Sequence, residues 1–184
     1  MTEVAPEPGH GTDLKVPLLF AVRDNKPKEA IRLLKEGAEV DYKDQTGCFP
    51  LHYAAQKGYI DVVDLLLEKG AETFAWDKNG QTALHKAAMQ GHVNAIISLV
   101  ARGARVDIID RTGRLALEYA VRSKHVAAVK LLCQFGSEPL LLDWTWLQDD
   151  DLKKKSDLFE IAKVLKRQLM RISGYKHGYV HFRL

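Results

Sequence analysis

Apolar and polar positions alternate with a fixed long period along this chain. Four aspartates, Asp44, Asp77, Asp110 and Asp143, follow one another at intervals of 33 residues. Each opens a block that runs from a turn through a short apolar segment to Gly or a substitute, and then through a longer apolar segment to a second Gly. An equal period without insertions indicates one unit copied along an axis, and such units bury their apolar faces only by stacking.

Aligning the blocks without gaps places leucines, alanines and glycines in shared columns. The first segment has apolar residues at helical spacing, with alanines where neighbouring helices approach closely. The second segment, as in VVDLLL at 62–67, has the wider apolar face of another helix, and the glycine beyond it is typical of a helix end. The columns contain Leu18, Leu51, Leu84 and Leu117; Ala21, Ala54, Ala87 and Ala120; and Gly37, Gly70, Gly103 and Gly136. The pattern predicts an all-α solenoid of helix–turn–helix units with loop hairpins.

The start of each unit carries a recurrent motif. It reads FPLHYAA at 49–55, TALHKAA at 82–88 and LALEYAV at 115–121, with a degenerate VPLLFAV at 16–22. On these residues the chain resembles the ankyrin repeat family, whose units of about 33 residues carry a TPLHxA signature. The resemblance covers about residues 11–143 and implies four ankyrin repeats, which we place at 13–143.

Two features of the motif lead to further expectations. The resemblance implies that His52 and His85 take part in hydrogen bonding between repeats. Repeat four has neither the capping Thr nor the Pro of the signature, and Glu118 replaces its histidine. Because a missing cap costs about 1 kcal/mol, we predict that repeat four is the loosest of the three well-formed units.

The pattern breaks after Asp143. A fifth unit would begin with a buried helix at Asp149, Asp150 and Asp151, where three carboxylates are costly to bury. Residues 156–173 again have amphipathic spacing, with Ser156 as a cap, so we predict a C-terminal capping helix there. The remaining segments are predicted to be a flexible N-terminal tail at 1–12, an acidic and basic linker at 144–155, and an aromatic C-terminal tail at 174–184.

The resemblance also implies where a partner binds. In ankyrin proteins the outer helix of each unit faces away from the partner, whereas the loop tips and inner helices form the binding surface. Trp76, Ile109 and Leu142 hold the last position of successive units and predict an exposed apolar patch of the kind that marks interaction sites. The alternative is that these side chains fold back onto adjacent loops. The predicted partner-binding residues are Trp76, Ile109, Leu142, Lys43, Gln56, Lys57, Met89, Gln90, Arg111, Arg114 and Arg122.

The charge distribution leaves two other functions open. The chain of 184 residues has a net charge of +3, but nine Lys/Arg and four Asp/Glu from Asp150 to Leu184 give +5, so the remaining residues carry −2. The basic C-terminal segment is therefore a candidate for binding nucleic acid or an anionic membrane. Self-association through Trp144 and Trp146 is a further alternative to the monomer that we expect.

Signs of catalysis and of metal or cofactor binding are absent from the sequence. It contains no phosphate-cradling glycine loop and no nucleophile paired with a base in a recognisable motif. Cys48 and Cys133 lie two units apart, too far to bridge, and we expect free thiols. No apolar run approaches the roughly 20 residues that span a bilayer, and the start lacks the features of a secretory signal. We therefore predict a cytoplasmic or nuclear protein-binding adaptor or scaffold without enzymatic activity, cofactor or metal.

Overall fold

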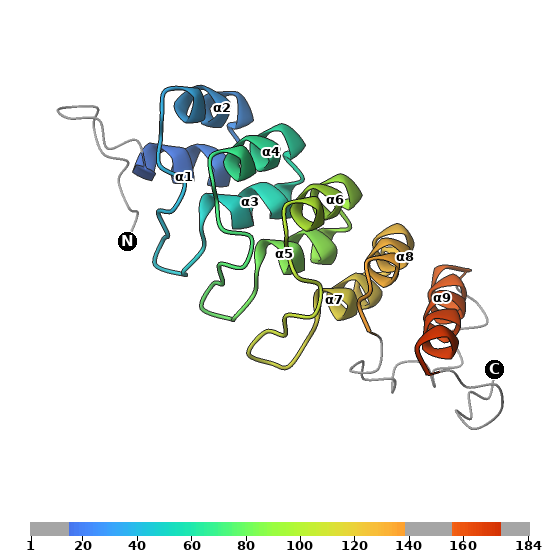
Figure 1. Cartoon of the computed structure of the whole chain (residues 1–184). Coiled ribbons are helices and arrows are strands. Elements are labelled where there is room, and N and C mark those ends of the chain that lie inside the picture. The colour runs from blue at the N-terminus through green and yellow to red at the C-terminus, as the bar shows by residue number, and fades with distance from the viewer. Residues whose placement is uncertain (1–14, 139–155, 174–184) are drawn as a thin grey trace.

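Paired helices form the framework of the computed structural model, which describes residues 15–138 and 156–173. Within these ranges the pairs stack along one axis, each joined by a tight turn (Figure 1). The helices are α1 (Lys15–Arg23), α2 (Pro27–Lys35), α3 (Pro50–Lys57), α4 (Ile60–Glu68), α5 (Ala83–Gln90), α6 (Val93–Ala101), α7 (Ala116–Arg122), α8 (Val126–Gln134) and α9 (Ser156–Ser173). The all-α solenoid predicted from the 33-residue period is confirmed.

The stack has two layers. The inner helices α1, α3, α5 and α7 contact one another in sequence, and the outer helices α2, α4, α6 and α8 form the second layer. The alanine column is buried between inner helices, where Ala54, Ala87 and Ala120 have no exposed surface. Small side chains at these positions let the inner helices approach closely, and larger apolar side chains fill the space between the layers.

The turns between inner and outer helices are hydrogen-bonded from one repeat to the next. Nε2 of His92 lies 3.1 Å from the carbonyl oxygen of Gln56, and Nε2 of His125 lies 3.2 Å from that of Met89. The imidazole of His125 approaches Gly91 so closely that a Cβ on this glycine would lie 2.5 Å from the ring. Glycine at this turn supplies both the left-handed backbone, with φ of 72°, and the space for the histidine.

The end of the stack next to α8 is covered by α9. This helix spans Ser156–Ser173, the range that amphipathic spacing predicts. It packs against α8 through Ile161 and Leu165, which are fully buried, and the Gln168 side-chain amide donates a hydrogen bond of 3.0 Å to the carbonyl oxygen of Cys133. The predicted segments 1–12, 144–155 and 174–184 lie outside the described residues, as does Leu142.

Candidate functional site

Three hairpin loops, which we call the fingers, extend from the same side of the stack (Figure 1). They comprise residues 43–48, 76–81 and 109–114. Each is closed near its base by a backbone hydrogen bond, such as that from the Asp77 N–H to the carbonyl oxygen of Gln81 at 2.9 Å. The equivalent bonds join Asp44 to Cys48 and Asp110 to Arg114. The loop hairpins predicted from the sequence are therefore present in all three fingers.

The aspartate that opens each finger holds the loop in shape. In the third finger, Oδ1 of Asp110 accepts hydrogen bonds from the N–H groups of Thr112 and Arg114 at 2.8 and 3.0 Å. The hydroxyl of Tyr119 on α7 donates to Oδ2 at 2.5 Å. Burial alone would raise the pKa of Asp110, but the hydrogen bonds from Tyr119, Thr112 and Arg114 outweigh it and hold this pKa well below its usual range. The carboxylate is thus ionised and directed into the finger.

The other two opening aspartates have the same role. Asp44 accepts a hydrogen bond of 2.6 Å from the Tyr53 hydroxyl, and Asp77 accepts one of 2.8 Å from the Lys86 ammonium. Asp77, like Asp110, is buried. The carboxylates of the fingers therefore serve the fold and are not displayed to a partner.

Neighbouring fingers are joined through their backbones. The Lys78 N–H donates to the carbonyl oxygen of Thr46, and the Arg111 N–H donates to that of Asn79, both at 3.0 Å. A Cβ on Gly80 would lie 2.8 Å from the Arg111 nitrogen, so glycine allows this close approach. Because these bonds use main-chain atoms, they fix the register of the fingers without the side chains of Lys78 and Arg111.

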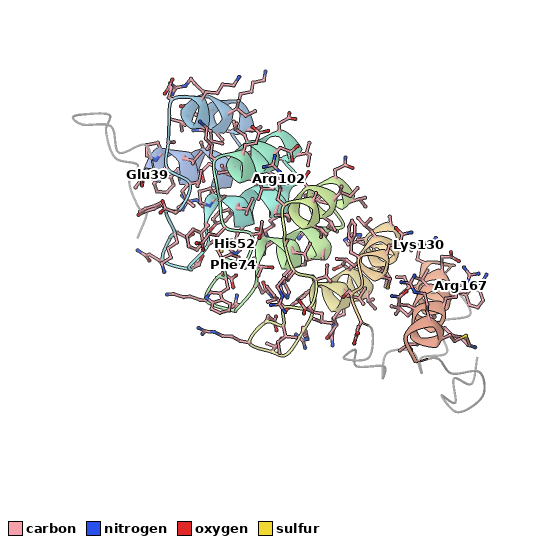
Figure 2. All side chains as sticks on the ribbon, in the orientation of Figure 1. Glu39, His52, Phe74, Arg102, Lys130 and Arg167 are labelled. Carbon is pink, nitrogen blue, oxygen red and sulfur yellow. The ribbon has the colours of Figure 1, made fainter. Side chains whose placement is uncertain are left out.

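Large apolar side chains lie exposed along the fingers. Trp76 is 67% exposed and Ile109 is 51% exposed, at equivalent positions of adjacent fingers. Neither is packed back onto the neighbouring loops, which was the alternative to an exposed patch. Phe74, which the sequence analysis did not single out, is 59% exposed just before the second finger (Figure 2). We call Phe74, Trp76 and Ile109 the apolar edge.

The other predicted contact residues divide into two groups. Five are exposed on the fingers and inner helices, whereas Gln56, Met89 and Arg114 are partly buried. The exposed five are Lys43, Lys57, Gln90, Arg111 and Arg122.

Arg114 and Arg122 are held by a carboxylate that the sequence analysis did not connect with them. Their Nε atoms lie 3.0 and 2.8 Å from Oε1 of Glu118, a residue whose side chain is buried on α7. Glu118 and Arg122 are four apart within α7, a spacing that brings side chains together on one face of a helix, and Arg114 reaches Glu118 from the end of the third finger. Both guanidinium groups therefore form ion pairs within their own repeat.

The signature histidines connect consecutive repeats. Nε2 of His52 lies 2.9 Å from the carbonyl oxygen of Gln81, and Nδ1 accepts the Phe49 N–H at 3.2 Å. His85 likewise bridges to the carbonyl oxygen of Arg114 at 3.2 Å. Burial lowers the pKa of both imidazoles, so they are neutral. The inter-repeat hydrogen bonding implied by the motif is thus found in the structure.

Family models agree with this geometry. One, described as ankyrin repeats (3 copies), matches residues 7–75, and another, described as ankyrin repeats (many copies), matches residues 51–100. The chain belongs to the ankyrin repeat family. Ankyrin repeats are general protein–protein interaction modules and are typically not enzymes. No curated protein matches the chain significantly.

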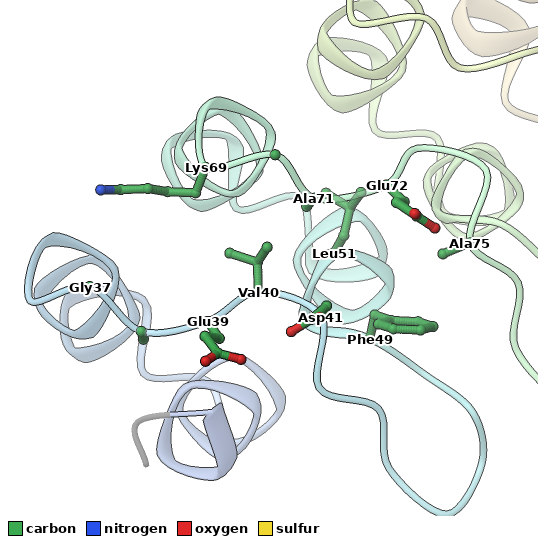
Figure 3. Close-up of a pocket in the computed structure, with 12 residues that line it drawn as sticks. Gly37, Glu39, Val40, Asp41, Phe49, Leu51, Lys69, Ala71, Glu72 and Ala75 are labelled. Atoms are coloured by element: carbon green, nitrogen blue, oxygen red, sulfur yellow. The ribbon is translucent and has the colours of Figure 1, made fainter. Parts of the chain in front are cut away.

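A groove lies beside the fingers of this ankyrin array. An open groove of about 530 Å³ runs between the loop segments 37–41 and 69–75 (Figure 3). Phe49, Leu51 and Val40 supply apolar lining, and exposed Glu39 and Glu72 stand among the residues around it. Small-molecule sites enclose most of a ligand within apolar walls. Because this groove is open, it is a weaker candidate for a binding site than the fingers.

The ankyrin array shows little sign of chemistry beyond binding. Both cysteines are free and buried, and burial raises the pKa of the Cys133 thiol to about 11, which leaves it protonated and unreactive. In residues 15–138 and 156–173, no cluster of three or more His, Cys, Asp or Glu is arranged to hold a metal ion. None of the helices in these ranges has the length and apolar character needed to cross a membrane.

Proposed function

We propose that this ankyrin protein is a scaffold or adaptor that holds another protein against its fingers, with Trp76 and Ile109 as the main apolar anchors. One observation carries the proposal. Two large apolar side chains occupy equivalent positions of neighbouring fingers, and more than half of each is exposed. Exposed apolar side chains gathered on one surface are typical of interaction sites.

The construction of the fingers favours tight binding by few contacts. The backbone bonds from Lys78 to Thr46 and from Arg111 to Asn79 hold the fingers in one arrangement before a partner arrives. A surface that is already ordered loses little conformational entropy on binding, so a small number of anchors is sufficient. Trp is among the commonest anchors of binding energy, and Lys57 and Gln90 on the inner helices extend the surface.

The proposal assigns roles to the rest of the chain. Residues 13–143 form the four-repeat binding array, and 156–173 covers its apolar end next to α8. No catalytic role is proposed, and we propose that the protein acts as a monomer. The chemical character of the fingers is the guide to the kind of partner that binds.

A peptide selection tests the proposal. A library of random peptides long enough to cross three fingers is selected on immobilised wild-type protein, and the affinities of the selected peptides are measured. We expect Trp76→Ala to weaken binding by about 2 kcal/mol or more and the double variant with Ile109→Ala to weaken it further. Ile97→Ala is the matched control, because Ile97 is an exposed apolar residue on the outer helix α6. Equal binding to the wild type and the double variant would contradict the proposal.

A second candidate function rests on α9. Phe159 and Met170 are exposed on this helix, together with Lys163 and Arg167. An exposed apolar and basic surface of this kind favours an anionic membrane or nucleic acid. The variant Lys163→Glu/Arg167→Glu should then lose binding to anionic lipid vesicles or to DNA, with an affinity that falls steeply as salt rises. Vesicles and DNA that bind this variant as well as the wild type would exclude α9 as the site.

A further inference from the structure

We infer that the segment bound by the fingers is acidic: an extended stretch of a partner protein that carries carboxylates beside its apolar anchors. The inference rests on the proposed function, because it concerns the same surface. It adds two properties of the ligand to the proposed function, namely its negative charge and its extended conformation.

The cations of the fingers are available to a partner. Lys43, Lys78 and Arg111 are exposed, one in each finger. In the part of the chain that the structure describes, none of the three forms an ion pair. Side chains that end in nitrogen extend outward from the fingers in Figure 2.

The carboxylates within the three fingers do not offset this charge at the surface. Asp77 and Asp110 are buried, and Asp44 is half-buried. All three accept hydrogen bonds at both carboxylate oxygens from groups within the array. The fingers thus direct their negative charge inward and their positive charge outward, and such an arrangement attracts anionic groups.

The order of residues in each finger defines the spacing of the ligand. Trp76 comes two residues before Lys78, and Ile109 comes two residues before Arg111. Each of these fingers therefore presents an apolar side chain followed by a cation. With about 10 Å between stacked layers, three fingers cover roughly 20 Å, the length of about six residues of extended chain. We infer a ligand in which acidic residues alternate with apolar ones at intervals of about three residues.

The outer helix α4 disfavours such a ligand. Asp61, Asp64 and Glu68 lie on the outer helix α4, and Lys69, which follows them, is the first cation after this acidic run. Like charges facing one another oppose association, so an acidic segment is directed away from α4 and toward the fingers. The difference in charge between the fingers and α4 orients the bound segment, in addition to the affinity that the apolar edge supplies.

A charge reversal tests the inference. The probes are fluorescein-labelled peptides of equal length and equal aromatic content that differ only in having Glu, Gln or Lys at the remaining positions. They are titrated against the wild type and against Lys78→Glu/Arg111→Glu, whose inter-finger bonds are retained because they use backbone atoms. Lys28→Glu/Lys35→Glu is the matched control, since it changes the net charge equally but on α2, and both lysines are exposed. Thermal unfolding of each variant checks that the array is intact.

The outcomes separate the inference from the proposed function. We expect the Glu peptides to bind the wild type at least about tenfold more tightly than the Gln or Lys peptides, to lose this advantage in Lys78→Glu/Arg111→Glu, and to weaken as salt rises. Gln or Lys peptides that bind as tightly, yet lose binding in Trp76→Ala/Ile109→Ala, would overturn the acidic ligand and leave the binding surface standing. Glu peptides unaffected by the Lys78→Glu/Arg111→Glu reversal would also overturn it. Peptides that bind Trp76→Ala/Ile109→Ala and the wild type equally would overturn both.

Discussion

The ammonium group of Lys86 lies 2.8 Å from Oδ2 of Asp77, and only 12% and 2% of the two side chains are exposed. Lys86 stands in the column where Tyr53 and Tyr119 donate hydrogen bonds to Asp44 and Asp110. One position of the repeat therefore holds the opening aspartate in all three fingers, with two different donors.

This equivalence predicts the behaviour of two substitutions at Lys86. Lys86→Met removes the donor and leaves the buried Asp77 carboxylate charged, so the free energy of unfolding should fall by about 3 kcal/mol. Lys86→Tyr places the donor of the other two fingers at this site and should recover most of the loss. Urea unfolding of the three proteins measures the difference. Equal losses in both variants would show that the column does not act as a common donor position.

Tyr59 is the basis of a second prediction. Its hydroxyl is buried and has no hydrogen-bond partner among the described residues, whereas His92 and His125 in the same column bond to carbonyl oxygens. Tyr59→Phe should leave the free energy of unfolding unchanged or raise it by up to about 1 kcal/mol, because it removes a polar group without a partner. Tyr53→Phe is the control and should lower stability, because its hydroxyl donates to Asp44. A large loss in Tyr59→Phe, measured by urea unfolding, would contradict the prediction.

The signature histidines predict how stability depends on pH. Burial lowers the pKa of His52 and His85 from the ordinary value of 6.5, so the unfolded chain binds more protons than the folded one just below that pH. The free energy of unfolding should therefore be highest above about pH 6.5. It should fall as the pH drops from 6.5 toward the lowered pKa of the folded state. His85→Gln should flatten this dependence in urea unfolding between neutral and mildly acidic pH. An unchanged slope would mean that other groups cause it.

The three opening aspartates act in a different pH range. The pKa of each is lowered: burial alone would raise it, but hydrogen bonds from neighbouring groups more than compensate. Their contribution to the free energy of unfolding is present above the ordinary aspartate pKa of 3.8 and is lost only as the pH falls below it. The histidine effect can therefore be measured without interference from them.

Repeat four should be the loosest of the three well-formed repeats. Its inner helix α7 begins after Leu115, which offers no side-chain cap, and Glu118 stands where His52 and His85 bridge to the next repeat. Glu118 forms ion pairs with Arg114 and Arg122, which stabilise α7 within the repeat. We expect amide hydrogens of α7 to exchange faster than those of α5. Equal protection of the two helices would show that these ion pairs replace the missing cap and bridge.

The parts of the fold that the sequence predicts are those fixed by local repetition. Each helix pair follows from columns in which leucine, alanine and glycine meet a fixed steric requirement in every unit. The span of α9 from Ser156 to Ser173 agrees with the amphipathic spacing of its sequence. Predicting these features does not require knowing which residues contact one another across the interface between repeats.

The candidate site was less predictable because it depends on neighbours in space. Phe74 shares its column with Asp41 and Asp107, so no apolar column marked it, and its exposure depends on how adjacent loops are placed. Arg114 and Arg122 were predicted as contacts, yet both pair with Glu118. Each of them lies four residues from Glu118, and this spacing was the signal that could have revealed the ion pairs.

Amide hydrogen exchange with a selected peptide bound tests the central claim most directly. Exchange in the complex is compared with exchange in the free protein across every described helix and finger. We predict that protection rises in the second and third fingers, residues 76–81 and 109–114, and in the inner helix α5, while the outer helices α4, α6 and α8 stay unchanged. Protection confined to the outer helices or to α9, with the fingers unaffected, would contradict the account.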